Sequence, residues 1–198
     1  MIKRQLAPGI VVYSNVIENH STLVQDIEEG ASSAKIEWGQ SSVRKGDNIE
    51  VDTEYRDTMI ISFDYKDYVD NDFVDIQNAF YSNLSNMLFL AINPLELDYK
   101  TSHQIETTGH ERYSLLKYGK GQKFVNHIDD HKDYNRKVSF VYYINDDYTG
   151  GEIVFPRFNL TYKPMANELI LFPSNYVYNH SVLPVIDGTR YAVVSWMS

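Results

Sequence analysis

Residues 124–129 read FVNHID and place an imidazole and a carboxylate two positions apart in a segment with β-strand character. Because side chains alternate between the two faces of a strand, His127 and Asp129 are expected to point to the same side. A nitrogen donor and an anionic oxygen donor directed at one point are suited to bind a metal ion. A complete site needs at least one further ligand from elsewhere in the chain.

The chain has 198 residues, 43% of them hydrophobic and 14% aromatic, which predicts one folded domain with a substantial core. It contains no cysteine, and this excludes disulfides, thiolate-bound zinc, cysteine-bound iron–sulfur clusters and cysteine nucleophiles. The first residues lack the apolar run of a signal peptide, and no stretch reaches the roughly 20 apolar residues of a membrane span. We therefore expect a cytoplasmic protein without membrane contacts, and the sequence leaves its oligomeric state open.

The formal net charge of −9 argues against broad binding to a nucleic-acid backbone, which needs a basic surface. The charge is uneven, because residues 112–137 carry seven lysines and arginines against three aspartates, a local charge of +4. Either this region is a solvated strand face, or it steers an acidic small molecule or an acidic peptide toward the candidate site.

The first 110 residues predict a supporting layer of mixed elements. Thr22 and Gln25 have the spacing of a capping box, and Gly30 is a typical helix stop. Asn93-Pro94 is expected to end a later, strongly amphipathic helix. In chain order we expect a strand at 8–13, a helix at 22–30, a loop at 39–48, a strand at 59–63 and a helix at 73–91. The apolar face of that last helix is assigned to Phe73, Ile76, Phe80, Leu84, Met87 and Ala91.

From residue 111 onward the sequence changes to short β-like segments separated by turn residues. These segments are 112–118, 124–129, 137–144, 152–155, 158–162, 168–172, 179–183 and 189–197. Regular short strands of this kind predict a sandwich or jelly roll. With the helices of the first part, the expected class is α+β, arranged as a single domain of residues 1–198 with its core at 111–198.

Two further residues stand out in the β region. His180 follows Asp129 by 51 positions, and a lone histidine on a strand is usually structural. Arg190, ten positions later, enters an otherwise apolar strand and needs an anionic partner, because a buried unpaired guanidinium is costly. The planar guanidinium is suited to a carboxylate.

These residues stand among LKYGKGQKF at 116–124, FVYYIN at 140–145, GGE at 150–152 and GTRY at 188–191. In this order the set resembles the 2-oxoglutarate- and Fe(II)-dependent dioxygenases of the prolyl 4-hydroxylase type, over about residues 112–198. The resemblance implies a double-stranded β-helix (jelly roll, cupin-like) core, with the N-terminal helices packed on its major sheet.

Carried over to this chain, the resemblance implies that His127, Asp129 and His180 bind Fe(II) and that Arg190 binds the distal carboxylate of 2-oxoglutarate. A plain hairpin between His180 and Arg190 would separate them by roughly 16 Å at about 3.3 Å per residue. Residues 183–188 are therefore expected to cross from one sheet to the other, a spacing of about 10 Å.

Three more positions match the family, and a fourth residue, His131, is placed near them by its position in the chain. Tyr118 and Tyr143 align with tyrosines that help to bind the cosubstrate, although a tyrosine on a strand is often simply packed. Trp196 matches a tryptophan near the site, for which a core position is an equal alternative. His131 shares a face with His127 if the strand continues, and we expect it at the rim of the site, outside the metal ligands.

The implied reaction hydroxylates a C–H bond, of a prolyl residue in a peptide or protein, with dioxygen as oxidant and decarboxylation of 2-oxoglutarate to succinate. Ascorbate is expected to support activity. Residues 39–48 and 130–135 are candidates for a mobile cover over the site, or are exposed loops without function.

Other functions stay open at this point. A zinc hydrolase would use His127 and His131 one helical turn apart, but the glutamate expected after the first histidine is missing. A nucleobase demethylase of the same superfamily would need a second arginine six residues after Arg190, where this chain has Trp196. Hydroxylation of another side chain or a small metabolite, and a non-catalytic cupin-like module that binds a metal or ligand, are further alternatives.

Overall fold

The computed structural model describes residues 1–45, 48–63, 73–131 and 135–198. Its helical elements are η1 (His20–Thr22), α1 (Leu23–Ser33), α2 (Val74–His103), η3 (Pro156–Phe158) and η4 (Tyr176–Tyr178). Its strands are β1 (Ile2–Ala7), β2 (Ile10–Ser14), β3 (Gly39–Gln40), β4 (Val43–Lys45), β5 (Asn48–Glu50), β6 (Met59–Ser62), β7 (Ser114–Tyr118), β8 (Phe124–His127), β9 (Val138–Tyr143), β10 (Thr149–Gly150), β11 (Ile153–Phe155), β12 (Leu160–Tyr162), β13 (Glu168–Pro173), β14 (His180–Val182), β15 (Val185–Asp187) and β16 (Arg190–Met197).

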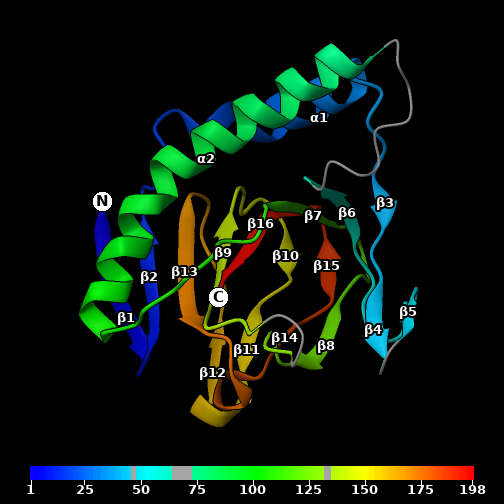
Figure 1. The fold of residues 1–198 in the computed structure, drawn as a ribbon. Coiled ribbons are helices and arrows are strands. Elements are labelled where there is room, and N and C mark those ends of the chain that lie inside the picture. The colour runs from blue at the N-terminus through cyan, green and yellow to red at the C-terminus, as the bar shows by residue number, and fades with distance from the viewer. Residues whose placement is uncertain (46–47, 64–72, 132–134) are drawn as a thin grey trace.

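The strands form two opposed sheets, as Figure 1 shows. The major sheet has eight strands in the order β1-β2-β13-β9-β16-β7-β6-β3, and the minor sheet has four in the order β12-β11-β14-β8. A two-stranded ladder, β10-β15, and the β4-β5 hairpin complete the β structure. This arrangement confirms the predicted α+β class with a double-stranded β-helix core. Strands from both parts of the chain share the major sheet.

Two hydrophobic cores lie on opposite faces of the major sheet. Along β9, Phe140 and Tyr142 belong to the core under the helices, whereas Val141 and Tyr143 belong to the core between the sheets. This alternation follows from the period of two along a strand. The fully buried β9 therefore separates a supporting face from a face directed at the interior of the jelly roll.

The helices α1 and α2 cover the outer face of the major sheet, as predicted (Figure 1). They approach closely at Gly30, where an added Cβ would lie 2.8 Å from the ring of Phe80. Gly30 is therefore a packing position inside α1, which continues to Ser33, and the prediction that Gly30 ends the helix is wrong. The capping box is also wrong, because the Thr22 hydroxyl donates to Asp26 and makes no capping bond.

The second helix, α2, is longer than predicted and buries a different face. It continues through Asn93-Pro94 to His103. Pro94 has no N–H for the carbonyl of Leu90, and Leu90 is 75% exposed, so water can satisfy that carbonyl. Ile76, assigned to the apolar face, is 50% exposed. The buried positions are Gln77, Tyr81, Leu84, Leu88, Ile92, Leu95, Glu96 and Tyr99.

The N-terminal strand prediction covered only half of a hairpin. β1 and β2 pair antiparallel, with Ala7 opposite Ile10, so Pro8-Gly9 forms the turn between two strands. Gly9 has a φ of 73°, which fits the second central position of a type II turn after proline. Met59–Ser62 forms a strand as predicted.

Other differences concern short segments. The predicted loop at 39–48 contains β3, β4 and the first residue of β5, while its residues 46–47 lie outside the described part. Of the candidate cover at 130–135, residues 132–134 are likewise not described. β10 and β15 were not predicted, because two or three residues are too few to show a period. Within the described residues, no helix has an apolar stretch long enough to cross a membrane.

Candidate metal centre

Strand pairing in the minor sheet brings the two histidines together. β8 and β14 are antiparallel, with His127 directly opposite His180, and their ring centroids are 4.3 Å apart. The His127 ring stacks on Phe124 at 3.5 Å, and the His180 ring meets Phe172 edge to face at 4.8 Å. Neighbouring aromatic rings therefore orient both imidazoles.

The aspartate reaches the same point from beyond the strand. β8 ends at His127, so the prediction that Asp129 lies on the strand is wrong. Its backbone is held on two sides, because the N–H of Asp130 donates to the Ser174 carbonyl and Arg136 donates to the Asp129 carbonyl at 3.2 Å. These contacts keep the carboxylate directed at the histidines although the ladder has ended.

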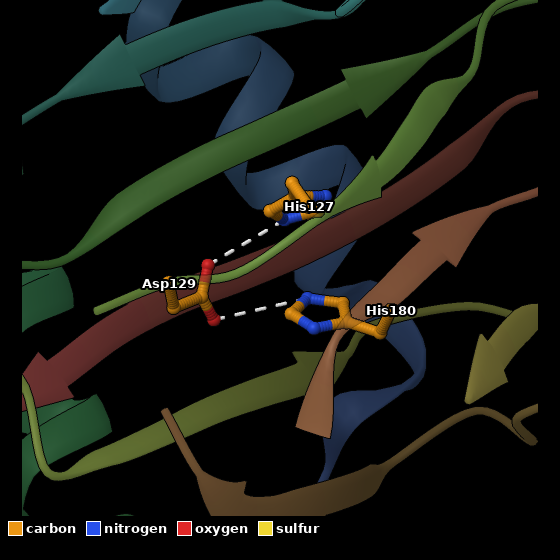
Figure 2. A group of neighbouring side chains, drawn as sticks. All are labelled: His127, Asp129 and His180. Carbon is orange, nitrogen blue, oxygen red and sulfur yellow. Dashed lines mark ion pairs between the residues drawn. The ribbon is translucent and has the colours of Figure 1, made fainter. Parts of the chain in front are cut away.

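The three side chains form a compact cluster, as Figure 2 shows. One carboxylate oxygen of Asp129 lies 3.5 Å from His127 Nε2, and the other lies 3.7 Å from His180 Nε2. The ligand atoms all lie within 4.8 Å of one another. Each side chain is less than one-tenth exposed, so the cluster is largely shielded from water.

Backbone carbonyls select the nitrogen that each histidine presents. His127 Nδ1 lies 2.9 Å from the Val125 carbonyl, and His180 Nδ1 lies 3.1 Å from the Tyr178 carbonyl. A carbonyl only accepts, so each Nδ1 carries the proton and each Nε2 keeps a free lone pair. Both lone pairs are directed at the region around Asp129, which is the outer-shell arrangement typical of histidine metal ligands.

The electrostatics of the cluster favour metal-binding protonation states. Burial, helped by the neighbouring His127, lowers the pKa of His180 to about 4, so its imidazole is neutral at pH 7. Burial alone would raise the pKa of the Asp129 carboxyl, but His180 and His127 hold it well below its usual range. The carboxylate is therefore ionised, as a metal ligand requires.

The spacing fits one first-row metal ion. Nitrogen and oxygen ligands at about 2.1 Å from an ion, with bond angles of about 90–110°, stand roughly 3.0–3.5 Å apart. The two nitrogen–oxygen distances of 3.5 and 3.7 Å are close to this range. Two histidines and one carboxylate are the donor set of the non-haem Fe(II) facial triad, which leaves further coordination positions open.

The cluster opens into a cavity of about 390 Å³ between the two sheets. His131 and Trp196, expected at the rim, both line it, and so do Tyr118, Tyr143 and Arg190. The cavity therefore brings together every residue that the sequence proposed for the site.

Arg190 lies in this cavity on the first residue of β16 and is only 2% exposed. Its guanidinium carbon lies 4.7 Å from the ring centroid of Tyr118 and 4.9 Å from that of Tyr143. Within the described chain, Arg190 Nε and Nη1 and the Tyr143 hydroxyl have no hydrogen-bond partner. Unpaired buried donors of this kind indicate a place for an anion.

The connection to Arg190 agrees with the predicted crossing between sheets. His180 lies in the four-stranded sheet, the chain then pairs through β15 with β10, and Arg190 begins β16 in the eight-stranded sheet. The plain hairpin that would have separated His180 from Arg190 does not occur.

Comparison with known families agrees with this geometry. Residues 113–198 match the sequence profile of the family described as the 2OG-Fe(II) oxygenase superfamily. This match covers less than half of the chain. The family name specifies Fe(II) and 2-oxoglutarate, and the His-Asp-His cluster of this chain offers ligands suited to such a metal.

A curated relative of this chain is a PKHD-type hydroxylase of Prochlorococcus marinus (strain MIT 9215), 36% identical over 84 residues. The match covers 39% of this chain and only 37% of that protein. A second PKHD-type hydroxylase, from Synechococcus sp. (strain JA-2-3B'a(2-13)), is 34% identical over 90 residues and is matched over 39% of its length. The chain thus matches about two fifths of the length of these curated relatives.

Solved structures extend the fold comparison to nearly the whole chain. A Pseudomonas putida prolyl-4-hydroxylase superposes with a TM-score of 0.65 at 18% identity, covering 96% of this chain and 92% of that one. A Trichoplax adhaerens prolyl hydroxylase, solved with a hypoxia inducible factor peptide, has a TM-score of 0.63 at 20% identity and covers 96% and 83%. The chain therefore shares the fold of these prolyl hydroxylases over nearly its whole length, N-terminal elements included.

The zinc-hydrolase alternative is wrong for this chain. It required His127 and His131 one helical turn apart, but His127 ends a strand and residues 128–131 form no helix. In the described chain, the group of closely spaced ligand atoms contains Asp129 and His180 and does not include His131.

Sequence reasoning missed Tyr148 as a residue of this cavity. Its hydroxyl is buried and has no partner among the described residues, and Arg190 counteracts the rise in the pKa of Tyr148 that burial causes. Lys163 Nζ lies 3.2 Å from the ring centroid. Gly151 marks the approach of these groups, since a Cβ there would lie 3.0 Å from the Tyr148 ring and 3.1 Å from Arg190. In the sequence, Tyr148 lies among turn-forming residues, where no alternating pattern indicates which way its side chain points.

Proposed function

We propose that this protein is a 2-oxoglutarate- and Fe(II)-dependent dioxygenase that hydroxylates a prolyl residue of a peptide or protein. The observation that supports this most strongly is the presence, in one cavity, of a His-Asp-His cluster and an unpaired buried arginine. The first is suited to a metal and the second to a dicarboxylate. The prolyl substrate is supported by the relatives, which are named PKHD-type and prolyl hydroxylases.

In this proposal His127, Asp129 and His180 hold Fe(II). When bound, the metal and 2-oxoglutarate supply the oxidative chemistry with dioxygen, and the protein supplies binding, orientation and shielding. The two Nε2 atoms are free because each Nδ1 donates to a backbone carbonyl. Apolar side chains such as Leu116 and Ile153 line the cavity and limit the access of water.

Arg190, Tyr143 and Tyr118 would hold the distal carboxylate of 2-oxoglutarate. A carboxylate accepts about four hydrogen bonds through its two oxygens. Arg190 Nε, Arg190 Nη1 and the hydroxyls of Tyr143 and Tyr148 are four buried groups without partners in the described chain. A single carboxylate is therefore sufficient to pair the buried donors, and Tyr148 joins the predicted residues in this role.

His131 and Trp196 lie on the substrate side in this proposal, because both line the cavity without joining the ligand cluster. We also infer that residues 1–198 form one domain. The major sheet combines β1, β2, β3 and β6 of the first part with strands of the second, so neither part has a complete sheet alone.

The direct test is succinate production from 2-oxoglutarate by protein supplied with Fe(II), ascorbate and proline-containing peptides. Mass spectrometry of the peptides identifies the addition of one oxygen and its position. Asp129→Ala should abolish both products, whereas Arg157→Gln, a change on an exposed 3-10 helix, should leave them intact. Wild-type protein that binds the metal but neither binds nor decarboxylates 2-oxoglutarate would overturn the proposal.

A further inference from the structure

We propose that the substrate of this site carries a carboxylate that pairs with Arg56, close to the carbon that is hydroxylated. This inference rests on the proposed function, because it assigns a substrate class to the same cavity. Its basis is a guanidinium that lines the cavity beside the metal cluster and has no acidic partner in the described chain.

Arg56 is placed next to the candidate metal ligands by a single aromatic residue. It forms an isolated antiparallel bridge with Phe124, the first residue of β8. Its guanidinium carbon lies 4.8 Å from the centroid of the Phe124 ring, and that ring stacks on His127 at 3.5 Å. One phenyl ring therefore links the cation to a ligand imidazole. The guanidinium carbon therefore lies no more than 8.3 Å from the centroid of the His127 ring, and both side chains line the same cavity.

The charge of Arg56 is not neutralised inside the described protein. Arg56 Nε is buried without a hydrogen-bond partner, and the side chain forms no ion pair with a described residue. The adjacent carboxylate of Asp57 is occupied, because it accepts hydrogen bonds from Gln40 and Gln122. The contact of Arg56 with Phe124 orients the guanidinium without removing its charge.

Arg136, another arginine of the cavity lining, contrasts with Arg56. Glu111 binds Arg136 through two hydrogen bonds of 2.6 Å, so the charge of Arg136 is neutralised by the protein itself. Arg190 faces Tyr143 and Tyr148 and is reserved for the cosubstrate in the proposed function. Arg56 is thus a cation that remains available to the substrate.

The charge balance of the cavity supports an anionic ligand. Among the described residues, its lining carries the arginines Arg44, Arg56, Arg136 and Arg190 and the carboxylates Asp129 and Asp130, while Glu111 pairs with Arg136. The whole chain nevertheless has a net charge of −9, so basic side chains are concentrated at the site. A fixed positive potential of this kind attracts acidic ligands and repels basic ones.

A carboxylate is the anion that fits best, because the planar guanidinium accommodates it with two parallel charge-assisted hydrogen bonds. In a peptide the group would be an aspartate or glutamate near the target proline. A free acidic molecule offers the same chemistry. A site built to pair with a charge discriminates against the uncharged isostere, here by about 10- to 100-fold in affinity.

The test measures binding without turnover. Proline-containing peptides with a single glutamate at successive positions around the proline, and matching glutamine peptides, are titrated into protein loaded with Fe(II) and 2-oxoglutarate under argon. We expect one glutamate position to bind at least about tenfold tighter than its glutamine counterpart. Arg56→Gln should abolish this preference, Arg56→Lys should retain part of it, and Arg56→Glu should reverse it toward lysine peptides.

Arg157→Gln, on an exposed 3-10 helix, is the control for the loss of one positive charge and should keep the preference. Competition by glutarate but by no glutamate peptide would assign the carboxylate to a small molecule. An equal preference in wild type and Arg56→Gln, with 2-oxoglutarate bound normally and both proteins folded, would overturn the inference alone. Failure of the wild type to bind 2-oxoglutarate would instead overturn the proposed function.

Discussion

Replacing Arg190 by methionine should weaken the binding of 2-oxoglutarate without lowering the stability of the metal-free protein. Arg190 is 2% exposed, and two of its guanidinium nitrogens have no partner in the described chain. Each unsatisfied buried donor costs about 1–3 kcal/mol. The contacts with the rings of Tyr118 and Tyr143 return about 0.5–2 kcal/mol each. We therefore expect Arg190→Met to leave the metal-free protein as stable as the wild type or up to about 2 kcal/mol more stable.

The same substitution should greatly weaken the binding of 2-oxoglutarate. A bidentate contact contains two hydrogen bonds to a charged group, each of about 1.5–3 kcal/mol. Their loss corresponds to at least about 3 kcal/mol, or a more than 100-fold increase in Kd. Arg190→Lys keeps the positive charge but loses the planar guanidinium, so its Kd for 2-oxoglutarate should lie between those of the wild type and Arg190→Met.

Urea unfolding of the metal-free proteins and calorimetric titration of 2-oxoglutarate into the anaerobic Fe(II) proteins measure the two effects. Gln77→Met is a suitable control, because Gln77 is buried but donates to the Ala34 carbonyl at 3.0 Å. It should lose about 1 kcal/mol of stability without any change in 2-oxoglutarate binding. A loss of about 3–5 kcal/mol in Arg190→Met, as when a buried ion pair is broken, would show that Arg190 is structural.

Three further predictions concern single groups. Asp129→Asn should weaken Fe(II) binding by at least about tenfold in equilibrium dialysis, since it removes the anionic member of the cluster; unchanged affinity would exclude the carboxylate as a ligand. Tyr148→Phe removes a buried hydroxyl that has no partner in the described chain, so it should raise the Kd for 2-oxoglutarate by about 3- to 10-fold without lowering the melting temperature. The control Tyr142→Phe loses the hydrogen bond to Asn167 and should lower only the melting temperature. Burial lowers the pKa of His110, but the hydrogen bond that its Nε2–H donates to Glu96 outweighs burial and raises this pKa above 6.5, so protonation favours the folded state. This stabilisation of the folded protein is complete below about pH 6.5 and is lost as the pH rises through the raised pKa of His110. The difference in unfolding free energy between wild type and Glu96→Gln should therefore be larger at about pH 6 than at about pH 9. An equal difference at both pH values would contradict the assignment of this stabilisation to the His110–Glu96 pair.

The β half of the fold was predictable because its information is local. Short β-like segments and turn residues located the strands of residues 112–197 in both sheets. The strand β9 shows the physical basis, because its successive side chains alternate between the core under the helices and the core between the sheets. The helix α2 shows the limit of this approach. Its hydrophobic residues indicated a helix, but the buried face includes Gln77 and Glu96, and Pro94 did not end it. Which face is covered depends on what packs against it.

The residues of the candidate site were also predictable from the sequence, but their arrangement in space was not. The types and order of His127, Asp129, His180 and Arg190 were evident in the sequence, because metal and carboxylate binding restrict the choice of side chain. Their meeting in one cavity depends on strand register and on the crossing through β15.

The sequence by itself thus determined the fold class and the chemically distinctive residues around FVNHID. Only the tertiary structure decided that Asp129 lies beyond the end of the strand, that Tyr148 faces Arg190, and that Arg56 lacks an acidic partner within the described residues. The physical reason is that side-chain type and period are local properties of the chain. Whether a charge is paired depends on neighbours that are distant in the sequence.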